Sequence, residues 1–113
     1  MTETTIFQKI INEEIPCDKL YEDELCIAFN DIQAHAPVHF LVIPKTPIIS
    51  LFDCIEEDAN LLGHLLIVGS KIAKSKKLTN WRTVINTGSE SGQTVFHLHI
   101  HFLSGRKMNW APG

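Results

Sequence analysis

The segment from Thr94 to Leu103, TVFHLHIHFL, constrains the fold more than any other part of the sequence, because it alternates in strict period two. Large apolar residues occupy one parity: Phe96, Leu98, Ile100 and Phe102. Half of the chain's six histidines occupy the other parity: His97, His99 and His101. This alternation predicts a β-strand with one apolar face, along which the imidazoles would follow one another at about 6.6 Å on the opposite face. A solvated strand that uses histidine as a polar filler is the plainer alternative, but histidine is neither a favoured strand former nor a common surface residue.

Length and composition predict one domain spanning residues 1–113, with the 44% hydrophobic and 20% charged content of an ordinary soluble globule. A net charge of -3 gives no basic surface for nucleic acid or for an anionic membrane, and we expect neither as a partner. The chain has no apolar run long enough to span a bilayer, and its N-terminus lacks the pattern of a signal peptide. Cys17, Cys26 and Cys54 are odd in number and lack CxxC spacing, which is typical of reduced thiols in a cytoplasmic protein.

Two helices are expected. Residues 4–16, TTIFQKIINEEIP, predict a short N-terminal helix that begins after Thr4 or Thr5 as N-cap and is stopped by Pro16. Residues 56–77 predict the main helix, with acidic residues at its start and lysines at its end, as the helix dipole favours. Its apolar residues form one broad stripe that could cover one face of a sheet.

Five strands are expected, at residues 19–23, 25–31, 38–43, 81–86 and 94–102. Their connections are mostly short, and the element order is α-β-β-β-α-β-β, which favours an α+β fold: a five-stranded antiparallel sheet with one main helix and a short N-terminal helix. The apolar parity of the last strand then packs under the main helix. The histidines face the other side of the sheet, where a ligand can reach them.

Three kinds of chemistry use clustered histidines. A zinc site could take two imidazoles at positions i and i+2 of a strand, but the third lies too far along, and no Asp, Glu or Cys stands at local ligand spacing. A general acid–base enzyme needs one or two histidines, so this mechanism does not explain why the third is present. A nucleophilic mechanism uses all three, because the flanking imidazoles can fix the tautomer of the attacking one and neutralise charge on the transferred group.

The run NTGSESGQT, residues 86–94, indicates which electrophile would be attacked. Gly88 and Gly92 free backbone N–H groups, and four Ser and Thr hydroxyls accompany them; such loops form nests for phosphate oxygens. Most Gly/Ser loops are merely hairpin turns. Directly before a row of histidines, however, the loop predicts a phosphate site beside a nucleophile.

The HLHIHFL segment, residues 97–103, resembles the signature of the histidine triad (HIT) family of nucleotide-binding hydrolases and transferases. Other parts of the chain resemble the Hint branch of that family, the histidine triad nucleotide-binding proteins: IFQKIINEEIP, AFNDIQAHAPVHFLVIPK, LLGHLLIVGSKIA, GQTVFHLHIHFLSGR and NWAPG. The likeness covers nearly the whole chain. It implies a HIT-like fold and a hydrolase that cleaves the P–N bond of purine nucleoside 5′-phosphoramidates, of adenosine 5′-monophosphoramidase type, without a metal or another cofactor.

The resemblance also implies a role for each histidine. His99 would attack the α-phosphorus and carry a nucleotidyl group, while His97 orients it through a backbone carbonyl that accepts from the second ring nitrogen of His99. His101 would contact the non-bridging phosphate oxygens. His39 matches a supporting catalytic histidine near His97, and Thr94 keeps the hydroxyl of the serine that is more usual at this catalytic position.

The remaining site residues are also implied by the resemblance. The phosphate and leaving-group end would comprise Asn86, Gly92, Gln93, Thr94, His99 and His101. Asp31 would accept from the ribose hydroxyls, and the base slot would be lined by Ile6, Phe7, Ile10, Phe29, Asn30, Ile32, Leu41 and Val95. From the residues alone, the apolar members of this set could equally be plain core. The family forms homodimers that bind purine nucleotides such as AMP or GMP, and Trp110 would reach the active site of the partner subunit.

Three alternative functions remain open at this point. One is a nucleotide-binding regulatory protein with little catalysis, against which the intact histidine triad weighs. Another is a dinucleoside polyphosphate hydrolase, as in a sister branch, although the NWAPG ending favours the Hint branch. The last is a zinc-dependent protein, which the missing ligand set disfavours.

Overall fold

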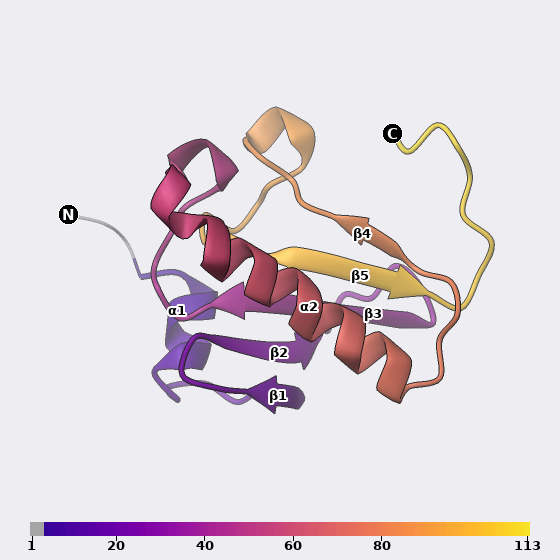
Figure 1. Ribbon diagram of the computed structural model, residues 1–113, viewed down its shortest axis with the longest axis horizontal. Helices are drawn as coiled ribbons and strands as arrows, with labels where there is room; N and C mark the ends of the chain where they lie inside the picture. Colours follow the sequence, from indigo (N-terminus) through magenta and orange to yellow (C-terminus); the bar gives the residue numbers. More distant parts are fainter. Residues whose placement is uncertain (1–3) are drawn as a thin grey trace.

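The computed structural model describes residues 4–113 and contains a five-stranded antiparallel sheet in the order β1-β2-β3-β5-β4 (Figure 1). Its strands are β1 (Lys19–Glu22), β2 (Cys26–Asn30), β3 (Val38–Pro44), β4 (Arg82–Val84) and β5 (Ile100–Ser104). Its helices are α1 (Ile6–Ile11) and α2 (Ala59–Ser75), with short 3₁₀ turns η1 (Leu51–Asp53), η2 (Glu56–Asp58) and η3 (Ser89–Ser91). The predicted α+β architecture is confirmed.

Helix α1 starts as expected and ends earlier. The Thr5 side chain accepts a hydrogen bond from the backbone N–H of Gln8, which satisfies one free donor of the first turn. The helix ends at Ile11, before Pro16 could stop it. Glu13 has a φ of 61°, in the left-handed region, which takes the backbone out of the helix.

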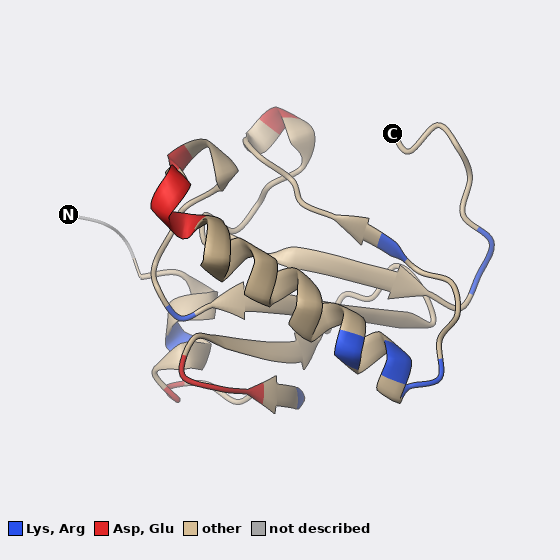
Figure 2. Cartoon of the chain, viewed as in Figure 1, with Lys and Arg blue, Asp and Glu red and all other residues tan. Residues whose placement is uncertain are grey.

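Helix α2 covers one face of the sheet. It begins at Ala59 rather than at residue 56, because Glu56–Asp58 form the 3₁₀ turn η2. The acidic residues lie at this end and lysines at the other, as Figure 2 shows, so the charges match the helix dipole as predicted. Among the described residues, no helix is long and apolar enough to cross a membrane.

The two faces of the sheet have separate cores. Leu65, Val68 and Ile72 of α2 pack in one cluster with Phe40 of β3 and Phe102 of β5, whose rings stack with centroids 5.0 Å apart. The second cluster, on the α1 side, contains Phe7, Ile10, Ile27, Phe29, Leu41 and Ile43. The apolar parity of the last strand therefore meets α2, as expected, and the histidine parity faces the side of α1.

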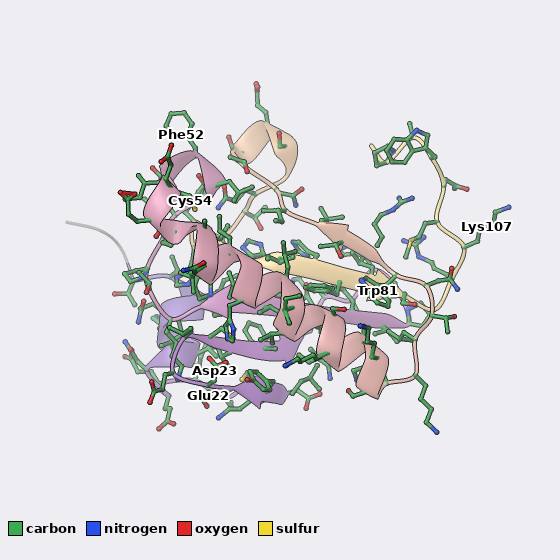
Figure 3. All side chains as sticks on the ribbon, in the orientation of Figure 1. Glu22, Asp23, Phe52, Cys54, Trp81 and Lys107 are labelled. Atoms are coloured by element: carbon green, nitrogen blue, oxygen red, sulfur yellow. The ribbon has the colours of Figure 1, made fainter. Side chains whose placement is uncertain are left out.

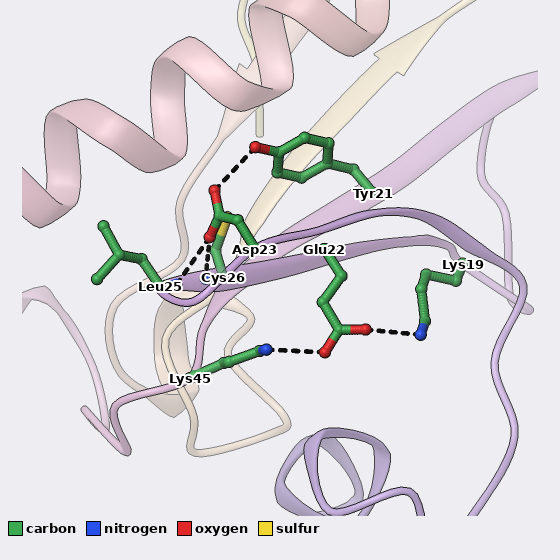
Figure 4. A network of polar contacts seen from close by, with 7 residues as sticks. All are labelled: Lys19, Tyr21, Glu22, Asp23, Leu25, Cys26 and Lys45. Carbon is green, nitrogen blue, oxygen red and sulfur yellow. Dashed lines mark hydrogen bonds and ion pairs between the residues drawn. The ribbon is translucent and has the colours of Figure 1, made fainter.

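The turn between β1 and β2 is fixed by Asp23 (Figure 4). Its carboxylate accepts from the backbone N–H groups of Leu25 at 2.7 Å and Cys26 at 2.8 Å, and from the Tyr21 hydroxyl at 2.9 Å. The His64 imidazole of α2 lies 2.7 Å from the same carboxylate. Burial alone would raise the pKa of Asp23, but these hydrogen bonds hold that pKa well below its ordinary value. The turn is thereby tied to the main helix.

The last strand is shorter than predicted. β5 begins at Ile100, and residues 94–99 lie outside it, so the expectation of three histidines on one strand is wrong. Val42 pairs with Ile100, and continuing this register would set Leu98 opposite Pro44, which has no N–H to share. The N–H of Leu98 donates instead to the carbonyl of Ile48 at 2.7 Å. Only His101 lies on the strand. Phe96, expected in the core, is 50% exposed.

Candidate functional site

A cleft of about 390 Å³ lies on the histidine side of the sheet. Its lining comes from the loop after β2, from β3, β4 and β5, and from the loop before β5: Asp31, Gln33, His35, His39, Val84, Asn86, Gly92, Thr94, His99, His101 and Leu103. A wider groove of about 1020 Å³ between the end of α2, β4 and the chain after β5 contains no histidine. Four imidazoles and a carboxylate therefore converge on the smaller cleft, which is the candidate active site.

The His99 ring is held in one tautomer. Its Nδ1 lies 2.7 Å from the backbone carbonyl oxygen of His97. A carbonyl only accepts, so Nδ1 carries the proton, and a neutral His99 keeps a lone pair on Nε2. This is the carbonyl contact that the family resemblance implies. It leaves the cleft with an unprotonated imidazole nitrogen, which is what a nucleophile needs.

His97 does not line the cleft. Its side chain is 2% exposed, and its Nε2 donates to the carbonyl oxygen of Pro44 at 2.8 Å. Pro44 is the last residue of β3, so this hydrogen bond fixes the segment before β5 against the sheet in place of ladder hydrogen bonds. His97 acts on the site through its carbonyl and not through its ring.

His39 and His101 form a pair. The backbone N–H of His35 donates to Nδ1 of His39 at 3.0 Å, so a neutral His39 carries its proton on Nε2. That nitrogen lies 2.9 Å from Nδ1 of His101, which must then accept, and the proton of a neutral His101 is on its own Nε2. The resemblance implies that His39 lies near His97, and the hydrogen bond that the structure shows for its Nε2 is to His101. His39 lies opposite Leu103 in the register, and His101 is two residues away from Leu103 on the same face of the sheet, so the two imidazoles meet diagonally across the strands.

Asp31 stands beside this pair. Its Oδ1 accepts from the backbone N–H of Gln33 at 2.9 Å, and its Oδ2 lies 3.5 Å from Nε2 of His39. The carboxylate is partly exposed, with 18% of its side-chain surface accessible. A hydroxyl-bearing ligand in the cleft could therefore reach it.

The phenyl ring of Phe7 covers the buried histidines from the side of α1. Its centroid lies 5.0 Å from the His99 ring and 6.2 Å from the His97 ring, both edge-to-face. Burial lowers the pKa of both histidines below its ordinary value. The hydrogen bond that each donates to a backbone carbonyl raises the pKa, but by less than burial lowers it. Both imidazoles are therefore neutral near pH 7.

Among the histidines whose pKa is lowered, His101 has the largest shift. Burial, followed by the neighbouring His99 and His39, lowers its pKa to about 4. Burial likewise lowers the pKa of His39, with Asp31 opposing the shift. His39, His99 and His101 are thus uncharged at neutral pH and offer N–H donors and a lone pair rather than fixed positive charge.

The loop before β5 brings two predicted glycines into the left-handed region, with φ of 89° at Gly88 and 99° at Gly92. Asn86, Gly92 and Thr94 line the cleft. These are three of the residues that the resemblance assigns to the phosphate end. Gln93 does not. Its side chain is 2% exposed, accepts from the N–H of Gly88 at 2.9 Å, and donates to the carbonyl oxygens of Ile49 and Val95. Gln93 fixes the loop from within.

None of the predicted base-slot residues lines the cleft. Four are buried in the core on the α1 side: Phe7, Ile10, Phe29 and Leu41. Val95 packs against that core, and the Asn30 amide donates to Asp18 at 2.8 Å. Ile6 is 47% exposed and Ile32 is 91% exposed, so these two offer apolar surface to a ligand. Trp110 is 86% exposed and does not reach the cleft of its own chain.

Four lining residues have no counterpart among the sequence expectations: Gln33, His35, Val84 and Leu103. Val84 and Leu103 follow from strand parity, because Leu103 shares the parity of the histidines and Val84 pairs with His101. Gln33 and His35 lie in the loop between β2 and β3, which carries no periodic pattern. Only the concentration of polar residues after Asp31 could have indicated them.

Two groups of side chains bring possible metal ligands within 4.8 Å of one another: Asp31, His39 and His101 at the cleft, and Asp23, Cys26 and His64 at the β1–β2 turn. Local sequence spacing could not indicate either complete group, because His39 and His101 come from different strands and His64 comes from α2. In the first group, His39 and His101 already bond to each other. In the second, burial raises the pKa of the Cys26 thiol to about 12, which disfavours the thiolate that binds zinc.

Similarity to known proteins extends over the whole chain. The family model described as "Scavenger mRNA decapping enzyme C-term binding" matches residues 4–111. An uncharacterised HIT-like protein of Synechococcus elongatus is 57% identical over 114 residues, with 100% of both chains covered. A HIT family hydrolase from Legionella pneumophila has a TM-score of 0.93 and 42% identity, covering 96% of this chain and 98% of that one. A histidine triad protein from Clostridium difficile has a TM-score of 0.90 and 44% identity, covering 96% and 97%. The chain belongs to the histidine triad family.

Proposed function

We propose that this protein hydrolyses purine nucleoside 5′-phosphoramidates through a nucleotidyl group on His99. The observation that carries the proposal is the pair of contacts at the His99 ring. The Nδ1–H of His99 donates to the His97 carbonyl oxygen, and the Phe7 ring helps to keep the imidazole neutral, so that Nε2 has a free lone pair at the cleft. A solved relative from Legionella pneumophila is described as a HIT family hydrolase, which agrees with a hydrolytic reaction.

In the proposed reaction, Nε2 of His99 attacks the α-phosphorus, the P–N bond breaks, and the leaving nitrogen takes a proton from water as the amine departs. The Nε2–H of His101 donates to a non-bridging phosphate oxygen, where negative charge increases in the transition state. Water then attacks the nucleotidyl-histidine, which releases the 5′-monophosphate and restores neutral His99. The backbone N–H of Gly92 already donates to the carbonyl oxygen of Ser89. The Thr94 hydroxyl and the Asn86 amide, both from residues that line the cleft, would therefore hold the remaining phosphate oxygens and the leaving group.

The nucleoside would lie at the Asp31 end of the cleft. Its ribose hydroxyls would donate to the partly exposed carboxylate of Asp31. The purine base would lie against the exposed side chains of Ile6 and Ile32. Ligands of this class would be AMP, GMP and their phosphoramidates.

A homodimer is part of the same proposal. Phe52 is 88% exposed and points away from the molecule, as Figure 3 shows, and Ile55 and Ile67 are 63% and 56% exposed. A second copy docked over this part of the molecule would remove these side chains from water. Trp110 could then meet the cleft of the partner subunit instead of its own. The reduced thiols agree with a location in the cytoplasm.

Two other functions remain distinguishable by experiment. A regulatory protein would bind purine nucleotides with little turnover. A metal-dependent hydrolase would use Asp31, His39 and His101 as ligands, but then a metal would have to break the hydrogen bond between the two imidazoles.

The test is the initial rate on adenosine 5′-phosphoramidate in the presence of excess EDTA, with His99→Ala as the matched variant. We expect turnover to survive EDTA and to fall by at least about 10³-fold in His99→Ala, because the nucleophile is lost. Thermal unfolding of both proteins shows whether the variant is folded. Activity that needs added metal, or that persists in folded His99→Ala, would overturn the proposal.

A further inference from the structure

The exposed Arg106 is connected to the buried histidine pair by hydrogen bonds on either side of the His35 backbone. Its Nε donates to the backbone carbonyl oxygen of His35 at 3.1 Å, across 71 positions in the sequence. The backbone N–H of the same His35 donates to Nδ1 of His39 at 3.0 Å, and His39 in turn bonds to His101 at 2.9 Å. The backbone C=O of His35 thus accepts from the guanidinium, and the backbone N–H of the same residue donates to the imidazole of His39.

The backbone brings Arg106 to this place by close packing. Gly105 has a φ of 98°, and a Cβ there would lie 2.7 Å from the Cβ of Pro37, so the turn after β5 rests directly against the loop between β2 and β3. Val38 pairs with Ser104 in the sheet, just beyond this contact. The Arg106 guanidinium is also held by its Nη1, which donates to the Lys107 carbonyl oxygen at 3.3 Å.

The donor at His35 decides which nitrogen of each imidazole carries a proton. As long as this N–H points at Nδ1 of His39, the only proton of a neutral His39 is on Nε2. His101 then accepts at Nδ1 and presents its Nε2–H to the cleft. If the loop moved, His39 could carry its proton on Nδ1, and the proton of His101 would be free to move to the nitrogen that faces away from a ligand.

We infer that Arg106 is a positioning residue. By holding the C=O of His35, it keeps the backbone N–H of His35 directed at Nδ1 of His39, so that His39 and His101 both keep the Nε2–H tautomer. Nothing about this tautomer depends on the substrate. Its consequence for turnover rests on the proposed phosphoramidate hydrolysis, in which the Nε2–H of His101 donates to the phosphate.

The decisive experiment reads the tautomers directly, by long-range ¹H–¹⁵N correlation spectra of the imidazoles at pH 7.5, in wild type and in Arg106→Met. Methionine keeps an apolar stem of similar length and removes the donor. Lys107→Met is the matched control, because it removes one positive charge at the neighbouring position. The Lys107 side chain extends from the C-terminal segment in Figure 3.

We expect wild type and Lys107→Met to show the Nε2–H tautomer at His39 and His101. In Arg106→Met, both rings should move toward a mixture of tautomers, while His99 keeps its Nδ1–H form. If phosphoramidates are substrates, kcat should fall about 10-fold in Arg106→Met alone, as for the loss of one hydrogen bond. Unchanged tautomers in Arg106→Met, or the same change in Lys107→Met, would overturn the inference. Absence of turnover in wild type would instead refute the proposed function and leave the tautomer result standing.

A second pair of variants tests the peptide itself. His35→Pro removes the N–H that donates to His39, whereas His35→Ala keeps that N–H and removes only the imidazole. The tautomers of His39 and His101 should change in His35→Pro and stay as in wild type in His35→Ala. A change in both variants would assign the effect to the His35 ring and overturn the role of its peptide.

Discussion

At the scale of single residues, backbone groups decide the state of each imidazole at the site. The Nδ1–H of His99 donates to the carbonyl of His97, and the Nε2–H of His97 donates to the carbonyl of Pro44. The backbone N–H of His35 donates to Nδ1 of His39. These partners cannot change their donor or acceptor character with pH, so they fix the tautomers more firmly than side chains could. A neutral nucleophile and a neutral donor can therefore stand 4.9 Å apart, measured between the ring centroids of His99 and His101.

Phe7 tests the link between burial and reactivity. In Phe7→Ala, water reaches the His99 ring, and its lowered pKa should rise toward the ordinary value of about 6.5. The acid limb of the pH profile of kcat/KM then moves to higher pH, since protonated His99 cannot attack. Asp31 and His101, which face the same ring, are unchanged in the variant.

Phe7→Leu is the control for this shift, because it keeps apolar cover over the ring and should move the limb less. The full pH profile of each variant is the measurement. A larger KM in Phe7→Ala with an unmoved acid limb would show that Phe7 serves only base binding.

At the scale of elements, the strand that carries the histidine signature shows what sequence pattern can and cannot predict. The alternation correctly predicts which side chains face α2, because Leu98, Ile100 and Phe102 lie in the core with that helix. The length of the strand could not be predicted from its own sequence, because it depends on Pro44 in β3. Pro44 would lie opposite Leu98, two residues beyond the Val42–Ile100 pair, and it has no N–H for the ladder. The link between His39 and His101 likewise comes from the β3–β5 register, which no local pattern contains.

The interface between α2 and β5 gives a prediction for stability. A Cβ at Gly69 would lie 1.9 Å from Cζ of Phe102, so Gly69→Ala must displace a ring that is 2% exposed. We expect it to lower the free energy of unfolding by about 1–3 kcal/mol, measured by urea denaturation. This overrides the higher helix propensity of alanine.

The double variant Gly69→Ala/Phe102→Leu provides the control. Leucine vacates the space that the new methyl group needs, so the double variant should be more stable than the sum of the two single effects predicts. Strict additivity would show that Gly69 is needed for another reason than the Phe102 ring.

At the scale of the whole molecule, four histidines with lowered pKa values predict acid sensitivity. His39, His97, His99 and His101 bind fewer protons in the folded than in the unfolded state between their lowered pKa values and about 6.5. Stability is therefore greatest above about pH 6.5 and falls as the pH drops, by up to about 1.4 kcal/mol per pH unit for each excluded proton. We expect Tm to fall between pH 7.5 and 5, and to fall less in His101→Asn. A flat or rising Tm over this range would contradict the pKa shifts.

The C-terminal segment gives a test of the proposed dimer. Trp110 is 86% exposed, whereas the preceding Asn109 is held by a hydrogen bond from Nη2 of Arg82 at 2.9 Å. A chain ending at Asn109 keeps this contact and loses the indole. If Trp110 reaches the partner's cleft, this truncation should change kcat/KM for phosphoramidates with bulky amines more than for the unsubstituted phosphoramidate. Equal kinetics on both substrates would place the tail outside the site.

The covalent step is the central claim of the proposed mechanism, and trapping it is the most direct test. Enzyme mixed with adenosine 5′-phosphoramidate would be quenched in denaturant at alkaline pH, where phosphorus–imidazole bonds persist, and then analysed by intact mass and peptide mapping. We predict one adenylyl group per chain, located on His99 and absent from His99→Ala. Steady turnover without any adduct, or an adduct on another residue, would contradict the assignment of His99 as the nucleophile.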